Sequence, residues 1–386
     1  MADRQCCHIY HRAGRGLVSV SSLRRPSSRI FLLVGGIANL LIALNAALLK
    51  LGVWAPVDQA DGNTHGYVMV IGFLGTLISL ERAQALAHRA PRHRWAYLAP
   101  LLLGIGGVVL GVGGTGTLAA VIGHFFMIEG ALIFCAIHCV LYLRTHGMIA
   151  AAQILSALSL FIATVLVLLW DISQLFFILA AFVIVTIAAE RAELAQLRMG
   201  PRAAPTLLVT SCALVLTSGI ALIWQSVGSR FFGAVLLIIA LWLIRDDVPR
   251  VFIRRTGLQR FTAGALLAGY VWLIIGALAV VITAAPAGTI FYDLVIHAIF
   301  VGFAMSMIMA HAPIIFPSVL GLRVPFVAAM WIPLVVLHMG LSIRVVSQIF
   351  IGQGHVWILG AVTSALAILG FLATTITVII RTAMRR

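Results

Sequence analysis

The sequence has very little charge for its length. Only 10% of its 386 residues are Asp, Glu, Lys or Arg, against about 25% in an ordinary soluble domain, and 62% are hydrophobic. These fractions exclude a soluble globular protein and a disordered chain. A bilayer span needs roughly 20 apolar residues, so the chain can cross a membrane many times, with no room for a separate soluble domain. Because lipid offers the backbone no hydrogen-bond partners, the sequence predicts an all-α integral membrane protein.

Lysine and cysteine are also scarce. Lys50 is the only lysine, and arginine supplies the rest of the 26 basic residues. A formal charge of +15 would suggest a nucleic-acid partner in a soluble protein. Here the arginines lie between apolar runs, so the lipid bilayer is the expected partner and nucleic acid is not. The five cysteines have no framework spacing, which excludes a disulfide scaffold.

Apolar runs between polar segments predict about twelve transmembrane helices. They form a single membrane domain over residues 30–380, between a flexible, basic cytoplasmic arm at residues 1–29 and a basic cytoplasmic tail at residues 381–386. The expected spans are residues 30–49, 65–84, 95–112, 116–143, 149–169, 172–189, 205–224, 230–244, 261–283, 290–312, 326–347 and 356–380.

The positions of the basic residues predict the orientation. With twelve spans, all 26 fall on one side of the membrane except Lys50, Arg230 and Arg344. The positive-inside rule then puts both termini in the cytoplasm of a multi-pass protein, for which we expect the bacterial inner (plasma) membrane.

Two histidine pairs at equal spacing lie inside the predicted spans. His124 and His138 are in span four, His297 and His311 are in span ten, and each pair is fourteen residues apart. Fourteen residues bring both rings of a pair to one helix face, roughly 21 Å apart along the axis. The two spans run in the same direction, so the pairs would lie at matching depths. If the two helices faced each other, each level would offer two imidazoles to one haem iron, for one or two b-type haems. This spacing resembles that of the di-haem membrane cytochromes b.

A second group of histidines is expected near the outer surface. His65 opens span two, His338 lies in the outer half of span eleven, and His355 opens span twelve. Imidazole is a ligand for copper, iron and zinc, so this group is a candidate metal site, with copper beside a haem as one outcome. Interfacial residues in contact with water are the alternative for His65 and His355.

The few carboxylates inside spans are candidate proton relays. Glu129 follows His124 in span four, and Asp293 lies four residues before His297 on the same face. The Glu-Arg pairs Glu81-Arg82 and Glu190-Arg191 mark the cytoplasmic ends of spans two and six, where we expect structural ion pairs.

Two segments carry a family resemblance. HGYVMVIGFLGTLISLERA begins at His65 and HAIFVGFAMSMIMAHAPIIFPSVLG begins at His297, and each has a histidine followed by Gly-Phe within the span. This form resembles the NnrS-like membrane haem proteins and, more distantly, the catalytic subunit of haem–copper oxidases. The resemblance implies haem, with copper as an additional metal, and a role with nitric oxide or oxygen, with His65, His297 and His311 as the candidate ligands.

Three functions stay open from the sequence. The first is a b-type haem or haem–copper redox protein, in the oxidoreductase class, for electron transfer or small-gas chemistry, with a quinol or a redox partner protein as donor. The second is a secondary transporter, because the histidine pairs lie six spans apart and two parallel six-helix halves would fit that class. The third is a metal-ion transporter that uses the outer histidines.

Overall fold

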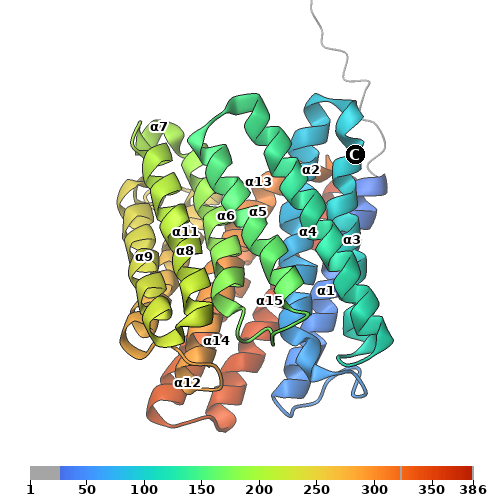
Figure 1. Ribbon diagram of the computed structural model, residues 1–386, viewed down its shortest axis with the longest axis vertical. Helices are drawn as coiled ribbons and strands as arrows, with labels where there is room; N and C mark the ends of the chain where they lie inside the picture. The colour runs from blue at the N-terminus through green and yellow to red at the C-terminus, as the bar shows by residue number, and fades with distance from the viewer. Residues whose placement is uncertain (1–26, 322–323, 385–386) are drawn as a thin grey trace, which may run out of the picture.

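The computed structural model describes residues 27–321 and 324–384 and is a bundle of long helices (Figure 1). The expected arm lies outside the described residues up to position 26, and Arg385 and Arg386 of the expected tail also lie outside them. No strand occurs in residues 27–321 and 324–384, so the all-α prediction is confirmed there. The longer helices are α1 (Ser27–Lys50), α2 (Gly75–Arg89), α3 (Leu98–Gly113), α4 (Leu118–Thr145), α5 (Met148–Leu166), α6 (Phe176–Leu194), α8 (Ala203–Ile223), α9 (Gln225–Asp246), α11 (Gly257–Thr283), α13 (Ser306–Leu320), α14 (Trp331–Phe350) and α15 (His355–Met384).

Short elements complete the chain. The π-helical segment η2 (Tyr67–Leu74) runs directly into α2, and α12 (Ile290–His297) continues through the π-helical segment η4 (Ala298–Met305) into α13. The connecting pieces are η1 (Gly62–Thr64), η3 (Pro91–Tyr97), α7 (Gln196–Met199), α10 (Pro249–Phe252) and η5 (Ala328–Met330).

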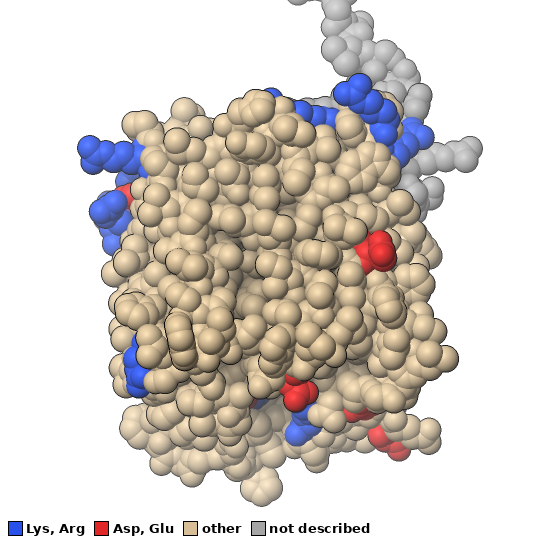
Figure 2. All heavy atoms as spheres, in the orientation of Figure 1, with Lys and Arg blue, Asp and Glu red and all other residues tan. Residues whose placement is uncertain are grey.

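Eleven helices of the described chain are long and apolar enough to cross a membrane, which supports a multi-pass membrane protein. They correspond to the predicted spans except the sixth. Helix α6 has 19 residues but carries Glu190, Arg191 and Glu193 in its last turns, so it is less apolar over its whole length. The face shown in Figure 2 agrees with a bilayer environment, because its Lys and Arg side chains lie toward the two ends and a broad, almost uncharged belt lies between them.

Three helices form the centre of the bundle. In the most apolar part of the spans η2–α2 and α12–η4–α13, 72% of the residues are buried, against 28–50% in the other candidate spans. Every residue of α6 from Phe176 to Ala192 is also buried. A helix that is apolar on all sides is stable only when neighbours surround it, and α6 packs on α5, α8, α9 and η4. In Figure 1, α8, α9 and α11 lie on one side of the bundle and α3 and α4 on the other.

The bundle has two distinct ends. Helix α1 begins and α15 finishes at one end, which we call the terminal end; the other is the opposite end (Figure 1). Helices α2, α6 and α12–α13 all start at the opposite end and run toward the terminal end. Residues near the starts of these helices therefore gather at one level, and residues near their ends at another.

Close glycine contacts hold α4 against α3. A Cβ atom added at Gly123 would lie 2.8 Å from the carbonyl oxygen of Gly106, and one at Gly106 would lie 2.7 Å from the carbonyl oxygen of Gly123. Small residues allow such close backbone approach between helices in lipid. Helix α4 packs on α3 and α5, and extensive contact with α12, η4 or α13 is absent. The condition that spans four and ten face each other is therefore not met by the described helices, because α4 packs on α3 and α5 instead.

We predict that Gly123→Ala destabilises the protein by about 1–3 kcal/mol, because the new methyl group overpacks a backbone contact. Gly219→Ala is the matched control, since nothing lies within 4 Å of a Cβ atom there. Unfolding in mixed detergent micelles measures both. Equal stability of the two variants would contradict this account of the α3–α4 contact.

Candidate functional site

A cluster of polar side chains lies at the opposite end of the bundle, around His297. Arg344 of α14 binds both oxygens of Asp293, with Nη2–Oδ1 at 2.7 Å and Nε–Oδ2 at 3.2 Å. The guanidinium of Arg344 also lies 4.3 Å from the centre of the Trp357 ring on α15. Arg344 is only 7% exposed, so the carboxylate and the ring compensate its charge in a site with little water.

Backbone carbonyls fix the rings of His65 and His297. Nδ1 of His65 lies 2.8 Å from the carbonyl oxygen of Ala43, and Nδ1 of His297 lies 2.7 Å from that of Asp293. A carbonyl can only accept, so both Nδ1 atoms carry the proton and both Nε2 atoms keep a lone pair. Within the described chain, neither Nε2 atom makes a hydrogen bond. Both rings lie near the opposite end of the bundle, His65 just before η2 and His297 at the end of α12.

Asp61 orders the loop that delivers His65. Its carboxylate caps η1, accepting from the backbone N–H of Asn63 at 2.8 Å, and it accepts from the backbone N–H of Thr115 at 2.8 Å. The Thr115 hydroxyl donates to the same carboxylate and is the main reason that the pKa of Asp61 lies below its ordinary value. The loop before α2 is thereby tied to the loop between α3 and α4, which sets the position of the His65 backbone.

The histidines of α4 are not brought to this cluster. The His124 ring lies edge-on to Tyr67, with ring centres 5.4 Å apart. His138 is buried against Phe134 at 4.6 Å, and its Nδ1 atom has no hydrogen-bond partner in the described part of the chain. Because α4 does not pack along α12 and α13, the expected pairs His124–His297 and His138–His311 do not form.

The other predicted metal ligands are dispersed. The indole N–H of Trp272 donates to Nδ1 of His338 at 3.0 Å, so Nε2 of His338 carries the proton and faces the Ser306 hydroxyl at 3.3 Å. His355 is exposed at the start of α15. Across residues 27–321 and 324–384, no three His, Cys, Asp or Glu side chains are grouped to hold a metal ion. A copper site at His65, His338 and His355 gains no support from this arrangement.

The two predicted proton relays have different surroundings. Asp293 is bound by Arg344 and lies 3.3 Å from Nδ1 of His297, so it belongs to the cluster at the opposite end. Glu129 is exposed on the outward face of α4, among apolar residues such as Phe125 and Leu132. It therefore lies away from the centre of the bundle and from the histidines of the central helices.

A second polar cluster lies at the terminal end, where α2, α6 and α13 meet. Arg82 of α2 donates to Glu190 of α6 at 2.9 Å and lies 3.6 Å from Glu81 and 3.4 Å from the more exposed Glu193. Both Arg82 and Glu190 are more than nine-tenths buried. One guanidinium thus faces three carboxylates, so the cluster carries excess negative charge unless it takes up protons.

Arg191 joins this cluster to the far side of α6. It binds both oxygens of Asp247 at 2.8 Å, and Asp247 also accepts from the Tyr270 hydroxyl at 2.5 Å. Nη1 of Arg191 lies 3.1 Å from Nε2 of His311, whose Nδ1 faces the carbonyl of Met307. An arginine only donates, so the Nε2 lone pair of His311 is already used and His311 is held as a neutral hydrogen-bonding residue.

A small cavity of about 100 Å³ opens between these central helices. Apolar side chains of α1, α2, α6 and α13 form most of its wall, and its polar lining is Glu81, Thr186, Glu190 and His311. This volume holds a few water molecules, and the carboxyl groups and the imidazole offer them partners.

Sequence reasoning missed much of both clusters. The Glu-Arg pairs were expected to be ion pairs at the membrane boundary, yet Arg82 and Arg191 point into the protein. Asp247 and Tyr270 gave no signal, because their partner lies on another helix. The sequence did contain a signal for Arg344, because it is a basic residue inside a predicted span, on the side of the membrane where basic residues are rare.

Comparisons with known proteins identify the family to which the chain belongs. The family model described as "Domain of unknown function (DUF8744)" matches residues 29–380, and the chain therefore belongs to this family. No curated protein and no solved structure matches it.

We predict that Asp247→Ala destabilises the protein by about 3–5 kcal/mol, because it leaves the buried Arg191 guanidinium without its carboxylate. Asp246→Ala is the neighbouring control, since Asp246 pairs with the exposed Arg245. Thermal unfolding in detergent should show a large loss for the first variant and little change for the second. Similar melting temperatures would mean that Arg191 is not held by Asp247.

Proposed function

We propose that this DUF8744-family protein holds a b-type haem near the opposite end of the bundle, with His65 and His297 as axial ligands, and acts in electron transfer or in chemistry on a small gas. One observation carries the proposal. His65 and His297 come from two different central helices, both donate Nδ1–H to a backbone carbonyl, and both leave the Nε2 lone pair unused. Metal-bound histidines commonly have this arrangement, because the second hydrogen bond fixes the tautomer and the ring orientation.

The surrounding residues suit that role. Asp293 holds His297 through its backbone carbonyl, and Arg344 holds Asp293 through two hydrogen bonds. The π-helical segments η2 and η4 begin two residues after His65 and one residue after His297. Such segments are often retained at functional sites because they change where neighbouring side chains project. A bound b-type haem would supply a one-electron carrier or an iron atom that binds a gas.

The geometry supports one haem better than two. His138 and His311 lie on helices that do not face each other, and Nε2 of His311 accepts from Arg191. Glycines near the two histidines serve helix packing: a Cβ atom at Gly72 would meet Asn39, and one at Gly302 would meet Trp272. A second haem and copper remain predictions from the sequence alone.

The NnrS-like resemblance agrees with this proposal. It singled out His65, His297 and His311, and the first two are the residues with free Nε2 atoms. On the basis of this resemblance, we propose that the protein has a redox role in the bacterial inner membrane and receives electrons from a quinol or from a partner protein.

A proton-coupled transporter is the second candidate function. The excess of carboxylates around Arg82 and the cavity that Glu81, Glu190 and His311 line favour it. Proton binding at such a site would change the charge of buried groups on all three central helices.

We further propose that α6 is a twelfth crossing and that the terminal end faces the cytoplasm. Helix α6 runs the same way as α2 and α12–α13 and is surrounded by candidate spans. The arginine-rich loops gather at the terminal end, in accordance with the positive-inside rule. The two parallel six-helix halves stay a prediction.

The test of the haem site is a dithionite-reduced minus air-oxidised spectrum of purified protein, with haem counted as its pyridine haemochrome. We expect a b-type spectrum with one haem per chain. His65→Ala and His297→Ala should each remove nearly all the haem, whereas His124→Ala and His138→Ala should retain it. Size-exclusion profiles report whether each variant is folded.

Two results would overturn the assignment. Haem loss from His124→Ala or His138→Ala, with His65→Ala unaffected, would restore the pairing expected from the sequence. A colourless wild-type protein, expressed with ample haem, would rule out the haem protein and leave the transporter.

The topology has its own prediction. Alkaline phosphatase fused within residues 114–117 or 284–289 should be active, because these loops lie at the opposite end. Fusions within residues 195–202 or after residue 384 should be inactive in intact cells, because that end faces the cytoplasm. Activity at residues 195–202 would show either that α6 does not cross the membrane or that the orientation is reversed.

A further inference from the structure

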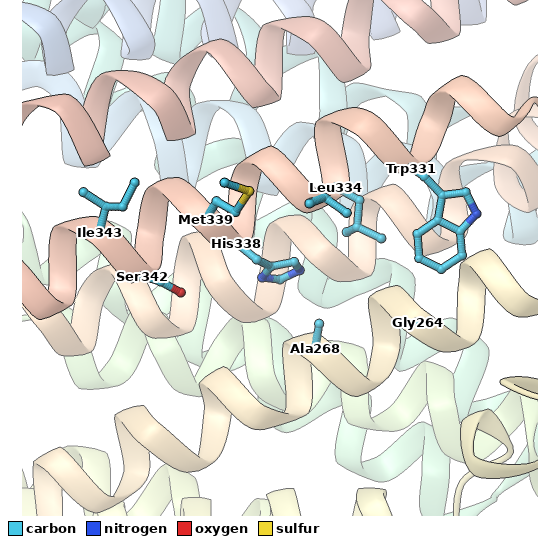
Figure 3. Close-up of a pocket in the computed structure, with 9 residues that line it drawn as sticks. Gly264, Ala268, Trp331, Leu334, His338, Met339, Ser342 and Ile343 are labelled. Carbon is cyan, nitrogen blue, oxygen red and sulfur yellow. The ribbon is translucent and has the colours of Figure 1, made fainter.

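A groove between α11 and α14 opens on the apolar outer surface of the bundle (Figure 3). Its larger part has a volume of about 540 Å³, and an adjoining part of about 390 Å³ shares Ala268, His338 and Ser342 with it. Because the groove lies within the membrane-spanning part of both helices, an occupant must enter from the lipid.

The walls are apolar except at one place. His338 and Ser342 lie one turn apart on α14 and both line the groove (Figure 3). No charged side chain lines either part. Trp331 closes one end by packing over Gly264, where a Cβ atom would lie 2.7 Å from the indole ring, and Trp272 lines the adjoining part.

The Ser342 hydroxyl is available to a ligand. Hydroxyls of this chain that lie in helices usually donate to the carbonyl four residues back, as Ser306, Ser364 and Thr375 do. Ser342 is exposed to the groove and makes no hydrogen bond within the described residues. An unpaired hydroxyl in an apolar surrounding gains from any acceptor that reaches it.

His338 can supply a second hydrogen bond. The Trp272 indole donates to its Nδ1 atom, which leaves the proton on Nε2. That proton points to the Ser306 hydroxyl at 3.3 Å, a long contact that a better acceptor in the groove can replace. Ser306 keeps its own bond to the Gly302 carbonyl at 2.6 Å when this happens.

These features define the ligand chemistry. A lipid acyl chain would use neither polar group, and a charged headgroup would find no counter-charge. A flat, uncharged ring that carries carbonyl oxygens and arrives through the bilayer satisfies the volume, the aromatic end wall and both donors. We propose that this groove binds the head ring of an isoprenoid quinone, with Ser342 and Nε2–H of His338 donating to one carbonyl oxygen and the isoprenoid tail in the lipid.

The groove lies close to the proposed haem ligands. Ser306, which contacts His338, follows His297 by nine residues of one continuous helix, roughly 13 Å along the axis. A quinol bound here would be a suitable electron donor for that site. This donor role rests on the proposed function, whereas quinone binding itself does not.

The test measures binding of decylubiquinone to the purified full-length protein in lipid nanodiscs. We expect Ser342→Ala to weaken binding about three- to tenfold, from the loss of one hydrogen bond. Ala268→Phe should abolish it, because the ring fills the groove opposite His338 (Figure 3). Ala136→Phe is the matched control on the exposed face of α4 and should bind like the wild type.

A photoreactive azidoquinone locates the site independently. Labelled peptides should come from α14, residues 331–350, and an excess of decylubiquinone should prevent the labelling. Labelling elsewhere, or labelling that excess phospholipid removes equally well, would overturn the proposal and point to an ordinary lipid in the groove. Unchanged affinity of Ser342→Ala together with Ala268→Phe would also overturn it.

Failure of the two proposals can be told apart. If the haem-free His65→Ala variant binds decylubiquinone, the groove stands and only its donor role depends on haem. If a haem-containing wild type shows no binding, the groove proposal fails and the haem site is unaffected.

Discussion

The pairing of buried arginines with carboxylates on neighbouring helices is the constraint on which the arrangement depends. A guanidinium that is removed from water is strongly unfavourable unless a carboxylate balances it. Arg191 with Asp247, Arg82 with Glu190, and Arg344 with Asp293 each join two helices that are far apart in the sequence. Apolar contacts between helices distinguish poorly between one helix neighbour and another, whereas each of these arginines is bound by carboxylates of one particular other helix. We infer that they fix the order in which the central helices pack, and that apolar packing then follows it.

Much of the fold follows from the sequence because its signals are long and local. Apolar runs predict most of the spans to within a few residues, since hydropathy averages over some twenty positions. The sixth span was predicted at 172–189, whereas α6 covers Phe176–Leu194. This difference has a physical cause. The helix continues past its apolar run because Glu190 and Arg191 form ion pairs inside the bundle, so the first charged residues do not coincide with the end of the helix.

The site was harder to predict because it depends on which helices are neighbours. The apolar run correctly places His297 and His311 in one continuous span, but the fourteen-residue spacing describes one helix and not its partner. His124 and His138 have the same spacing on α4, which glycines hold against α3. His65, which the family resemblance and the outer histidine group both indicated, follows the loop that Asp61 orders and lies at the same end of the bundle as His297. The direction of the hydrogen bonds then shows which histidines have a lone pair available for a metal. Nε2 has an unused lone pair in His65 and His297, whereas it accepts from Arg191 in His311 and carries the proton in His338.

The space between the two clusters bears on the choice between an electron carrier and a transporter. Along the central helices, residues 66–80, 176–189 and 298–310 contain no charged side chain, and their buried polar groups are hydroxyls such as Thr76, Thr186 and Ser306. An ion that crossed this layer would leave its water with few groups to replace it, which is strongly unfavourable in a low dielectric. Electrons do not need such a polar path. The apolar layer between the clusters therefore favours the proposed redox centre over a continuous route for a transported ion.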